Sequence, residues 1–383
     1  MRIGLNAIGF NPGRMGGVET YFRQLLHHLQ LEDGAHSYLI ACKNTDVGSF
    51  KLQNPRFSVK AFEIGKPSLQ WLIRSVLFEV AHIDIIKPLM NRLPVDVLHH
   101  PFTVLEPLNL RIPSVLTFWD MQQEFYPEFF TRREMRLRKY AYRASTKQAR
   151  RIIVSSEFTR KCLVERYGVN PEKTDIVYTG YGDEYRPIKD DAILYVVRHR
   201  YRLPDEFIYY PAALWPHKNH CVLFDAVRLV HDRYGLKVNL VLSGMSTGRG
   251  SELRAEILRR GLEGMVTVLG YLPYEDLPSL YNLATMMVFP SLFEGFGIPL
   301  LEAMACGCPV VCSRTTSIPE VVEKAALLFD PQSAEEIASA IFKVWNDIDL
   351  RGKMRLAGLK RAGMFDWRET ARRTLAVYEK ACD

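Results

Sequence analysis

The sequence predicts an α/β protein made of two doubly wound, Rossmann-like domains, and three observations lead to this prediction. Short apolar runs of strand length alternate with segments whose apolar residues have helical spacing, as in parallel sheets covered by helices. At 383 residues the chain is long for a single hydrophobic core. Prolines and charges gather between Tyr185 and Phe207 and interrupt the alternation. We therefore expect one domain over residues 1–190 and a second over residues 205–364, facing each other across a cleft.

The first half of the chain contains strand and helix candidates at irregular intervals. The strand candidates are short and apolar, namely Arg2–Ala7, Ser37–Ala41, Val95–His99, Ser114–Phe118 and Arg151–Val154. The helical stretches are Val18–Leu29, Leu69–Met90 and Phe158–Arg166.

The second half alternates more regularly. Its strand candidates, which have the composition of buried parallel strands, are Phe207–Ala213, Lys237–Ser243, Met286–Pro290, Pro309–Cys312 and Ala326–Phe329. Between the first two, Asn219–Tyr234 carries apolar residues on one helical face. The last segment, 365–383, has a partial helical stripe from Phe365 to Tyr378, and we expect it to dock as a helix on the nearest domain.

Composition indicates a folded protein and limits the class of partner. Hydrophobic residues make up 48% of the chain and charged residues 24%, which is ordinary for a globular protein and unlike a disordered chain. The formal net charge of +7 agrees with an anionic substrate or an anionic membrane surface. It is smaller than the charge of a dedicated nucleic-acid binder, so we expect no nucleic-acid partner.

The cysteines and the N-terminal residues indicate a cytoplasmic protein. The seven cysteines have no disulfide-framework spacing and no zinc-type spacing, so we expect reduced thiols and no metal. Met1 leads directly into a strand candidate, without an apolar signal core. No uninterrupted apolar window reaches about 18 residues, because charges interrupt the nearest candidate, Trp71–Met90.

The segment 291–311, SLFEGFGIPLLEAMACGCPVV, is the most informative part of the sequence. Glu294 lies in a loop with Gly295, Phe296 and Gly297, just after a strand candidate. Such a loop between a strand and a helix presents free backbone N–H groups and the positive end of a helix dipole, which favour a phosphate.

A helix is predicted directly after this loop. Ile298 and Pro299 open it, because proline is tolerated in the first turn, where its missing N–H has no intrahelical partner. Glu302 is predicted in the same first turn. Two glutamates beside an anion site suggest a ligand with both phosphates and hydroxyls, and a nucleotide sugar fits this description.

A second candidate site follows the strand candidate Phe207–Ala213. Lys218, in the sequence LWPHKNH, is expected at the carboxyl end of that strand, where ligands of open α/β sheets bind. Its ammonium group can act as a point charge against a diphosphate, and the alternative is a surface lysine in the first turn of a helix.

Two glycine-bearing turns are further candidates for contact with the nucleotide. Ser243 and Gly244 end the next strand candidate, and Gly17 follows Gly16 between the first strand and the first helix. Each is either a loop that approaches a nucleotide or a plain turn. The glycines after Gly244 lack the ordered GxGxxG context, so they give little support to a redox enzyme.

Histidines and an aspartate are candidates in the first half. His99 and His100 end one strand candidate, and Asp120 follows another. An imidazole there could bind a sugar hydroxyl or share a proton in transfer, and the sequence leaves open which histidine does so. Either histidine could instead be structural.

Two charged segments have competing interpretations. Asp347 and Asp349 form a DxD, which we interpret as a solvated helix end rather than a metal site. The segment 131–151 is dense in arginine and lysine, and it is either a solvated helix face or a contact with an anionic membrane.

The motif from Glu294 to Glu302 resembles the E-x7-E signature of the large retaining glycosyltransferase family 4, which has the GT-B fold. Gly16-Gly17, His217-Lys218-Asn219 and the downstream Ser317-Ile-Pro-Glu320 support the resemblance in the expected order. It implies donor binding by the C-terminal domain, acceptor binding by the N-terminal domain, and a last helix that returns to the N-terminal domain.

The resemblance also implies roles for individual residues. Glu302 would bind the ribose and Glu294 the donor sugar, with Lys218 on the diphosphate. The amides of Gly295, Phe296 and Gly297 would face the phosphates or the sugar. The sequence departs from the family where a histidine usually precedes Asp120, since that place holds Trp119, and where an arginine usually precedes the lysine.

The reaction implied is metal-independent transfer of a hexose, with retention, from a nucleoside-diphosphate sugar to a hydroxyl of a saccharide or lipid-linked acceptor. Bacterial surface polysaccharide or glycolipid assembly is the expected setting, with the protein cytoplasmic or peripheral on the inner face of the cytoplasmic membrane. The alternatives are a GT-B sugar-nucleotide epimerase or hydrolase, and a scaffold that binds nucleotide sugars without turnover.

Overall fold

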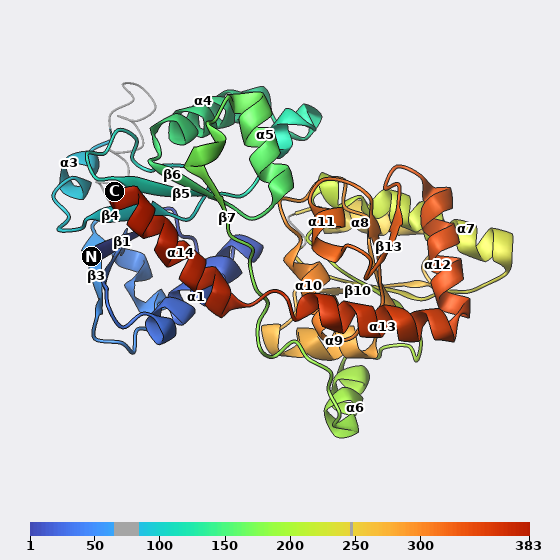
Figure 1. Cartoon of the computed structure of the whole chain (residues 1–383). Coiled ribbons are helices and arrows are strands. Elements are labelled where there is room, and N and C mark those ends of the chain that lie inside the picture. The colour runs from blue at the N-terminus through green and yellow to red at the C-terminus, as the bar shows by residue number, and fades with distance from the viewer. Residues whose placement is uncertain (65–83, 246–247) are drawn as a thin grey trace. The chain divides into compact units, whose positions relative to one another are not determined.

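The computed structural model describes residues 1–64, 84–245 and 248–383 and divides into two compact units. Met1–Thr179 and Trp367–Asp383 form the first unit, and Gly180–Asp366 form the second (Figure 1). The first segment of the first unit thus ends at Thr179. The sequence predicted that the first domain extends to residue 190. Tyr185 and the proline-rich stretch belong to the second unit.

The first unit is built on a seven-stranded parallel sheet in the order β3-β2-β1-β4-β5-β6-β7. Its strands are β1 (Arg2–Ala7), β2 (Ser37–Lys43), β3 (Phe57–Phe62), β4 (Val97–His100), β5 (Ser114–Phe118), β6 (Arg151–Val154) and β7 (Thr174–Ile176). Its helices are α1 (Gly17–Glu32), α3 (Lys87–Met90), α4 (Arg132–Gln148), α5 (Glu157–Tyr167) and α14 (Trp367–Cys382).

The second unit is built on a six-stranded parallel sheet in the order β10-β9-β8-β11-β12-β13. Its strands are β8 (Ile208–Pro211), β9 (Leu240–Ser243), β10 (Val266–Gly270), β11 (Met286–Phe289), β12 (Val310–Ser313) and β13 (Leu327–Phe329). Its helices are α6 (Asp191–Arg200), α7 (His220–Tyr234), α8 (Gly250–Arg259), α9 (Leu277–Leu283), α10 (Ile298–Ala305), α11 (Ile318–Val322), α12 (Ala334–Asn346) and α13 (Ile348–Ala362).

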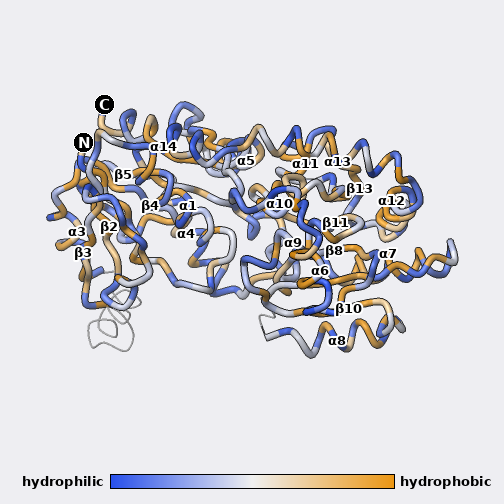
Figure 2. The backbone as a smooth tube through the Cα atoms, turned by 90° about the horizontal axis from the view of Figure 1, so that it is seen from below, coloured by the Kyte–Doolittle hydropathy of each residue, from blue (hydrophilic) through white to orange (hydrophobic). Residues whose placement is uncertain are grey.

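Both units therefore have the predicted doubly wound α/β architecture. Central strands such as β11 are buried along their whole length, as expected for strands covered by helices on both faces. Apolar residues of α7 face the sheet, and Figure 2 shows hydrophilic and hydrophobic residues alternating along this helix. Gly235 ends α7 in the left-handed conformation that glycine adopts without strain.

Three strands, β3, β7 and β10, were not predicted, and each lies at an edge of its sheet. β3 and β10 end the order of their sheets, and exposed polar residues such as Ser58 and Lys60 break the apolar pattern of β3. β7 is short and contains Asp175. The predicted strand Val95–His99 was displaced, since β4 begins at Val97 and includes His100.

The helix α14 belongs to the first unit although it is the last element of the chain. Its residues Trp367, Ala371 and Tyr378 are buried in the same hydrophobic cluster as Tyr21 of α1, and the two helices lie side by side (Figure 1). Thr370 Oγ1 also donates a 2.7 Å hydrogen bond to the backbone carbonyl of Tyr178.

Within the described residues, no helix has both the length and the apolar content needed to cross a bilayer. Most of the predicted helix Leu69–Met90, and most of the apolar candidate Trp71–Met90, lie outside the described residues.

Candidate functional site

The carboxyl ends of the strands in the second unit bring Lys218 and Glu294 together. Lys218 follows β8 at the end of the short 3₁₀ helix Pro216–Lys218, and Glu294 lies in the loop after β11. Lys218 Nζ is 2.5 Å from Glu294 Oε1, and the side chains are 17% and 13% exposed. Because β8 and β11 are neighbours in the sheet, the sequence prediction that both residues lie at this edge is correct.

Hydrogen bonds from Asn219 hold the loop that carries Lys218. Asn219 has positive φ, and its Nδ2 donates to the carbonyls of Pro290 at 3.1 Å and Pro331 at 2.7 Å. The hydroxyl of Tyr210 donates to the Lys218 carbonyl at 2.7 Å. Three loops are therefore joined around the lysine, which fixes its position.

The loop of Glu294 is held from its other side by the segment before α11. The Glu294 backbone N–H donates to Thr316 Oγ1 at 3.2 Å, and the Ser317 hydroxyl donates to the carbonyls of Glu294 and Phe296 at 3.0 and 3.1 Å. Gly297 is the N-cap of α10 with φ of 105°, a conformation that a side chain would strain. The loop is therefore rigid without the help of a ligand.

The helix α10 begins at Ile298 with Pro299 in its first turn, as predicted. The placement of Glu302 in that turn was wrong, because the helix starts early enough to put Glu302 in its second turn. Glu302 is only 8% exposed and accepts a 2.9 Å hydrogen bond from the Tyr281 hydroxyl of α9. Burial raises the pKa of this carboxyl to about 7.

Ser243 and Gly244 line a cavity of about 710 Å³ at the carboxyl ends of β8, β9 and β10. Ser243 Oγ is 2.7 Å from the Tyr209 hydroxyl. Gly244 has φ of 130°, and a Cβ there would lie 2.5 Å from the Ala212 carbonyl oxygen, so only glycine fits. The cavity has the size of a small-molecule site, and Arg254 adds a cation to its wall.

Two histidines next to Lys218 were not assigned a role from the sequence. Burial, and secondarily the charge of Lys218, lowers the pKa of His217 and of His220 to about 4, so both are neutral near pH 7. His220 Nε2 is buried without a hydrogen-bond partner. The only signal in the sequence was the presence of these histidines on either side of Lys218 and Asn219.

In the first unit, His99 is fully occupied by structural hydrogen bonds. Its Nε2 is 2.7 Å from Thr117 Oγ1 on β5, and its Nδ1 is 2.7 Å from the Tyr378 hydroxyl on α14. Burial, followed by the neighbouring His100, lowers the pKa of His99 to about 3. These contacts join β4 to β5 and α14, so His99 has no ring nitrogen available for a ligand.

His100 differs because one of its ring nitrogens has no partner. Its Nδ1 lies 3.0 Å from Asn6 Nδ2 and 3.2 Å from the Glu106 backbone nitrogen, and both of these groups are donors. Nδ1 must therefore accept, which leaves the proton on Nε2, a buried atom without a hydrogen-bond partner. Burial lowers the pKa of His100 to about 3, so the ring is neutral. Asn6, which fixes this tautomer, was missed, and its only signal was a polar residue in the apolar strand β1.

Trp119 and Asp120 follow β5. The Trp119 indole N–H donates to the Pro101 carbonyl at 2.8 Å, and Asp120 Oδ1 accepts from the Gln122 backbone N–H at 3.2 Å. Gly17 is the first residue of α1, and its neighbour Gly16 has positive φ as the N-cap. Gly17, His100 and Asp120 thus belong to the first unit, and the other predicted site residues belong to the second.

The DxD segment has the predicted structural role. Asp347 is the N-cap of α13, and its Oδ1 accepts the Leu350 backbone N–H at 2.8 Å. The basic segment forms α4, which Thr131 and Glu134 start with a capping box.

Comparisons with known proteins agree with this arrangement. The family model described as Glycosyltransferase Family 4 matches residues 15–185, and that described as Glycosyl transferases group 1 matches residues 197–361. O-antigen chain mannosyltransferase B of Escherichia coli is 32% identical over 268 residues, which are 70% of this chain and 70% of that protein. The serotype-specific mannosyltransferase WbdA of Escherichia coli is 29% identical over 238 residues, which are 60% of this chain and only 28% of WbdA.

The fold is shared with solved structures. HepE of Anabaena, in complex with UDP and glucose, superposes with a TM-score of 0.75 at 19% identity, covering 99% of both chains. The E-x7-E motif, the two matching family models and the E. coli relative lead to one assignment. The chain belongs to glycosyltransferase family 4 and is a glycosyltransferase of the GT-B fold.

Proposed function

We propose that the protein is a retaining mannosyltransferase that moves mannose from a nucleoside-diphosphate sugar to a hydroxyl of a growing surface polysaccharide. The pairing of Lys218 with Glu294 at the carboxyl edge of the second unit carries this proposal. The choice of mannose and of an O-antigen acceptor rests on the name of the E. coli relative. We expect the reaction to need no metal ion, since Lys218 supplies a cation where the diphosphate is expected.

The donor would occupy the second unit. Its diphosphate would lie near Lys218 and the backbone amides of the loop and helix start at 295–298, where the α10 dipole favours an anion. The cavity beside Ser243 and Gly244 would hold the base. Glu302 would accept from the ribose hydroxyls, because a carboxylate has more lone pairs than its tyrosine contact uses.

Lys218 and the backbone amides would contribute to the reaction by stabilising charge. Breaking the bond from the sugar to the phosphate places positive charge on the sugar ring and negative charge on the leaving diphosphate. Lys218 and the amides would stabilise the diphosphate, and their fixed positions avoid reorganisation during the reaction. The leaving phosphate oxygen can take the acceptor proton, so we assign no side-chain base. Glu294 would bind donor sugar hydroxyls beside Lys218.

His100 would supply a hydrogen bond from the first unit. Its Nε2–H is a buried donor without a partner, which is costly unless a ligand uses it. A hydroxyl of the acceptor would satisfy it. Asp120, after the neighbouring strand β5, would assist in binding the acceptor. The backbone at Gly17 would leave room for the ligand at the start of α1.

The test is a transfer assay with a panel of nucleotide sugars, with product analysis by NMR. The expected product from GDP-mannose or a related donor is an α-linked mannoside, formed also in the presence of EDTA. A β-linked product would exclude retention. Release of free sugar in the absence of acceptor, at the rate of transfer in its presence, would indicate a hydrolase. Lys218→Ala and Glu294→Ala should each lower kcat/KM at least about a hundredfold, and wild-type values in both would reject the site.

We also propose that α4 contacts an anionic membrane surface. Arg132, Arg133 and Arg136 are exposed on it, together with the large side chains of Leu137 and Tyr140, which are 52% and 57% exposed. Cations beside exposed apolar side chains are the composition of a helix that lies on an anionic bilayer. This location would bring the enzyme to a lipid-linked acceptor at the inner face of the cytoplasmic membrane.

A further inference from the structure

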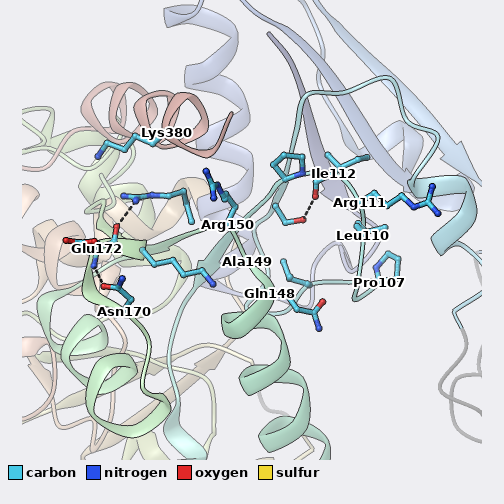
Figure 3. Close-up of a pocket in the computed structure, with 15 residues that line it drawn as sticks. Pro107, Leu110, Arg111, Ile112, Gln148, Ala149, Arg150, Asn170, Glu172 and Lys380 are labelled. Carbon is cyan, nitrogen blue, oxygen red and sulfur yellow. Dashed lines mark hydrogen bonds between the residues drawn. The ribbon is translucent and has the colours of Figure 1, made fainter. Parts of the chain in front are cut away.

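A second cavity lies at the edge of the first unit's sheet opposite to His100 and Asp120. Its walls include Ser114 and Arg151, which are the first residues of β5 and β6, and it has a volume of about 650 Å³ (Figure 3). His100 ends β4, and Asp120 follows the end of β5, so these candidates lie at the carboxyl edge. We call this cavity the amino-edge pocket. The proposed function gives it no role.

Positive charge dominates the amino-edge pocket. The charged residues on its wall are Arg111, Arg150, Arg151, Lys173, Lys380 and Glu172. Asp175, next to the wall, is held by two of these cations: Arg151 Nη2 lies 2.6 Å from Oδ2, and Lys380 Nζ lies 2.8 Å from Oδ1. The carboxylate of Asp175 is therefore already compensated and would not repel an anion strongly.

The negative end of the α4 dipole is also compensated. The last turn of α4 ends at the pocket with Gln148, and Lys173 Nζ donates to the carbonyls of Thr146 at 3.0 Å and Lys147 at 2.8 Å. A cation at a helix C-terminus offsets the partial negative charge there. The end of α4 would therefore add little repulsion for an anion.

Two arginines of the pocket remain without a compensating partner. In the described chain, the guanidinium groups of Arg111 and Arg150 make no ion pair and no hydrogen bond, although their backbone N–H groups are bonded to Asn91 and Ser114. Figure 3 shows the two arginines on separate parts of the wall, with Lys380 beyond Arg150. Guanidinium groups bind phosphate oxygens in a bidentate manner, and an extended phosphate-bearing group can reach cations that are apart.

We propose that the amino-edge pocket binds a phosphate group, which belongs either to an anionic lipid headgroup or to a soluble phosphorylated compound. The proposal does not depend on the proposed function, because none of its residues is assigned to donor or acceptor. It also does not depend on the exposed face of α4.

The test uses the full chain and the double variant Arg111→Ala/Arg150→Ala. Its matched control is Arg56→Ala/Lys60→Ala, which removes the same charge from exposed residues around β3, at the other end of the sheet. Calorimetric titration with inorganic pyrophosphate measures the affinity of the pocket for a phosphate group. We expect the double variant to lose one binding event, or about tenfold in affinity, while the control keeps it. Binding at the donor site is common to both variants and cancels in the comparison.

Flotation with phosphatidylglycerol and phosphatidylcholine vesicles identifies the source of the phosphate. If the phosphate belongs to a lipid headgroup, the double variant should bind phosphatidylglycerol vesicles more weakly than the control does. If it belongs to a soluble compound, the double variant should lose pyrophosphate binding while its flotation stays unchanged. If the double variant matches the control in both measurements, the proposal is wrong. The transfer assay is separate, so a failure of the proposed function would leave these results unaffected.

Discussion

The ammonium nitrogen of Lys218 lies 2.5 Å from Oε1 of Glu294, although the two residues are 76 positions apart in the sequence. Both side chains are more than four-fifths buried, so each charge depends on the other for compensation. A diphosphate beside Lys218 would share this cation with Glu294. Donor binding would therefore depend on the pairing of Lys218 with Glu294.

Removing one member of this pair should destabilise the protein more than removing both. Lys218→Ala or Glu294→Ala leaves one partly buried charge without its partner, at a cost of roughly 1–3 kcal/mol in the free energy of unfolding. The double variant should be more stable than the sum of the single changes predicts, by about 1 kcal/mol or more. Urea denaturation of the four proteins measures the coupling. Additive effects would show that the pair contributes nothing as a pair.

Glu302 should make the stability of the protein depend on pH. Its pKa is raised by burial from the ordinary carboxyl value to about 7, so ionisation is harder in the folded than in the unfolded state. The folded state is therefore favoured most below the unfolded pKa and loses stability as the pH rises towards about 7. The loss should be roughly 3 kcal/mol, since one unit of pKa difference corresponds to about 1.4 kcal/mol.

Glu302→Gln is the matched variant for this measurement, because glutamine keeps the volume but does not titrate. The difference in unfolding free energy between wild type and Glu302→Gln should change between about pH 4.5 and 7 in favour of the variant. A difference that is constant over this range would contradict the prediction.

Much of the fold was predictable because buried parallel strands have a simple sequence pattern. β1, β5 and β6 were predicted with their exact bounds, and they are apolar runs in the middle of the sheet. β3 was not, since this edge strand exposes polar side chains such as Ser58 and Lys60. The return of α14 to the first unit followed from the family resemblance and not from the stripe of apolar residues, which does not say where a helix docks.

The candidate site was predictable to the level of single residues where these follow a strand. Ser243 is the last residue of β9, and Lys218 and Glu294 lie in the segments that follow β8 and β11; neighbouring parallel strands bring such residues to one edge. The sequence could not distinguish His99 from His100, because successive residues of a strand differ only in which face they point to. The hydrogen bond between His99 and Tyr378, which is distant in sequence, identifies His99 as structural.

The two histidines should therefore respond differently to substitution. His99→Ala leaves Thr117 and Tyr378 without their partners in a buried place, and should lower the unfolding free energy by roughly 2–4 kcal/mol. His100→Asn should lower kcat of transfer by about tenfold or more, because asparagine has no donor at the place of Nε2–H. Its effect on stability should be smaller, since its amide oxygen can replace Nδ1 as the acceptor for Asn6 and the Glu106 backbone N–H. Thermal melts and transfer kinetics measured on both variants check this division. Equal loss of stability with unchanged specific activity for His100→Asn would assign His100 a structural role as well.

Asn219 should be important for both stability and donor affinity. Asn219→Ala loses buried hydrogen bonds to the carbonyls of Pro290 and Pro331 and places alanine at φ of 59°, which together should cost roughly 2–4 kcal/mol. Asn219→Gly loses the same bonds without the backbone strain, so it should be less destabilised by about 1 kcal/mol. Nucleotide affinity, measured by calorimetry, should fall in both variants, because Lys218 is no longer held in place. Full affinity in Asn219→Gly would show that the loop keeps its position without the asparagine.

The membrane contact of α4 can be tested with a variant that leaves its packing intact. Arg138 is unsuitable, since it donates to the Tyr142 hydroxyl at 2.8 Å and lies over the Phe130 ring. Serine at Arg132, Arg133 and Arg136 removes charge at three exposed positions of the helix.

The expected result for this triple variant is weaker flotation with phosphatidylglycerol vesicles. Each basic residue near an anionic surface contributes about 1 kcal/mol, so three should change the partition coefficient by about a hundredfold. Binding of the wild type should also weaken as salt shortens the range of the charges. The control is serine at Lys51, Arg56 and Lys60, exposed residues elsewhere in the first unit with the same total charge. Equal flotation of the two triple variants would mean that α4 does not make the contact, and that any attraction comes from other parts of the protein.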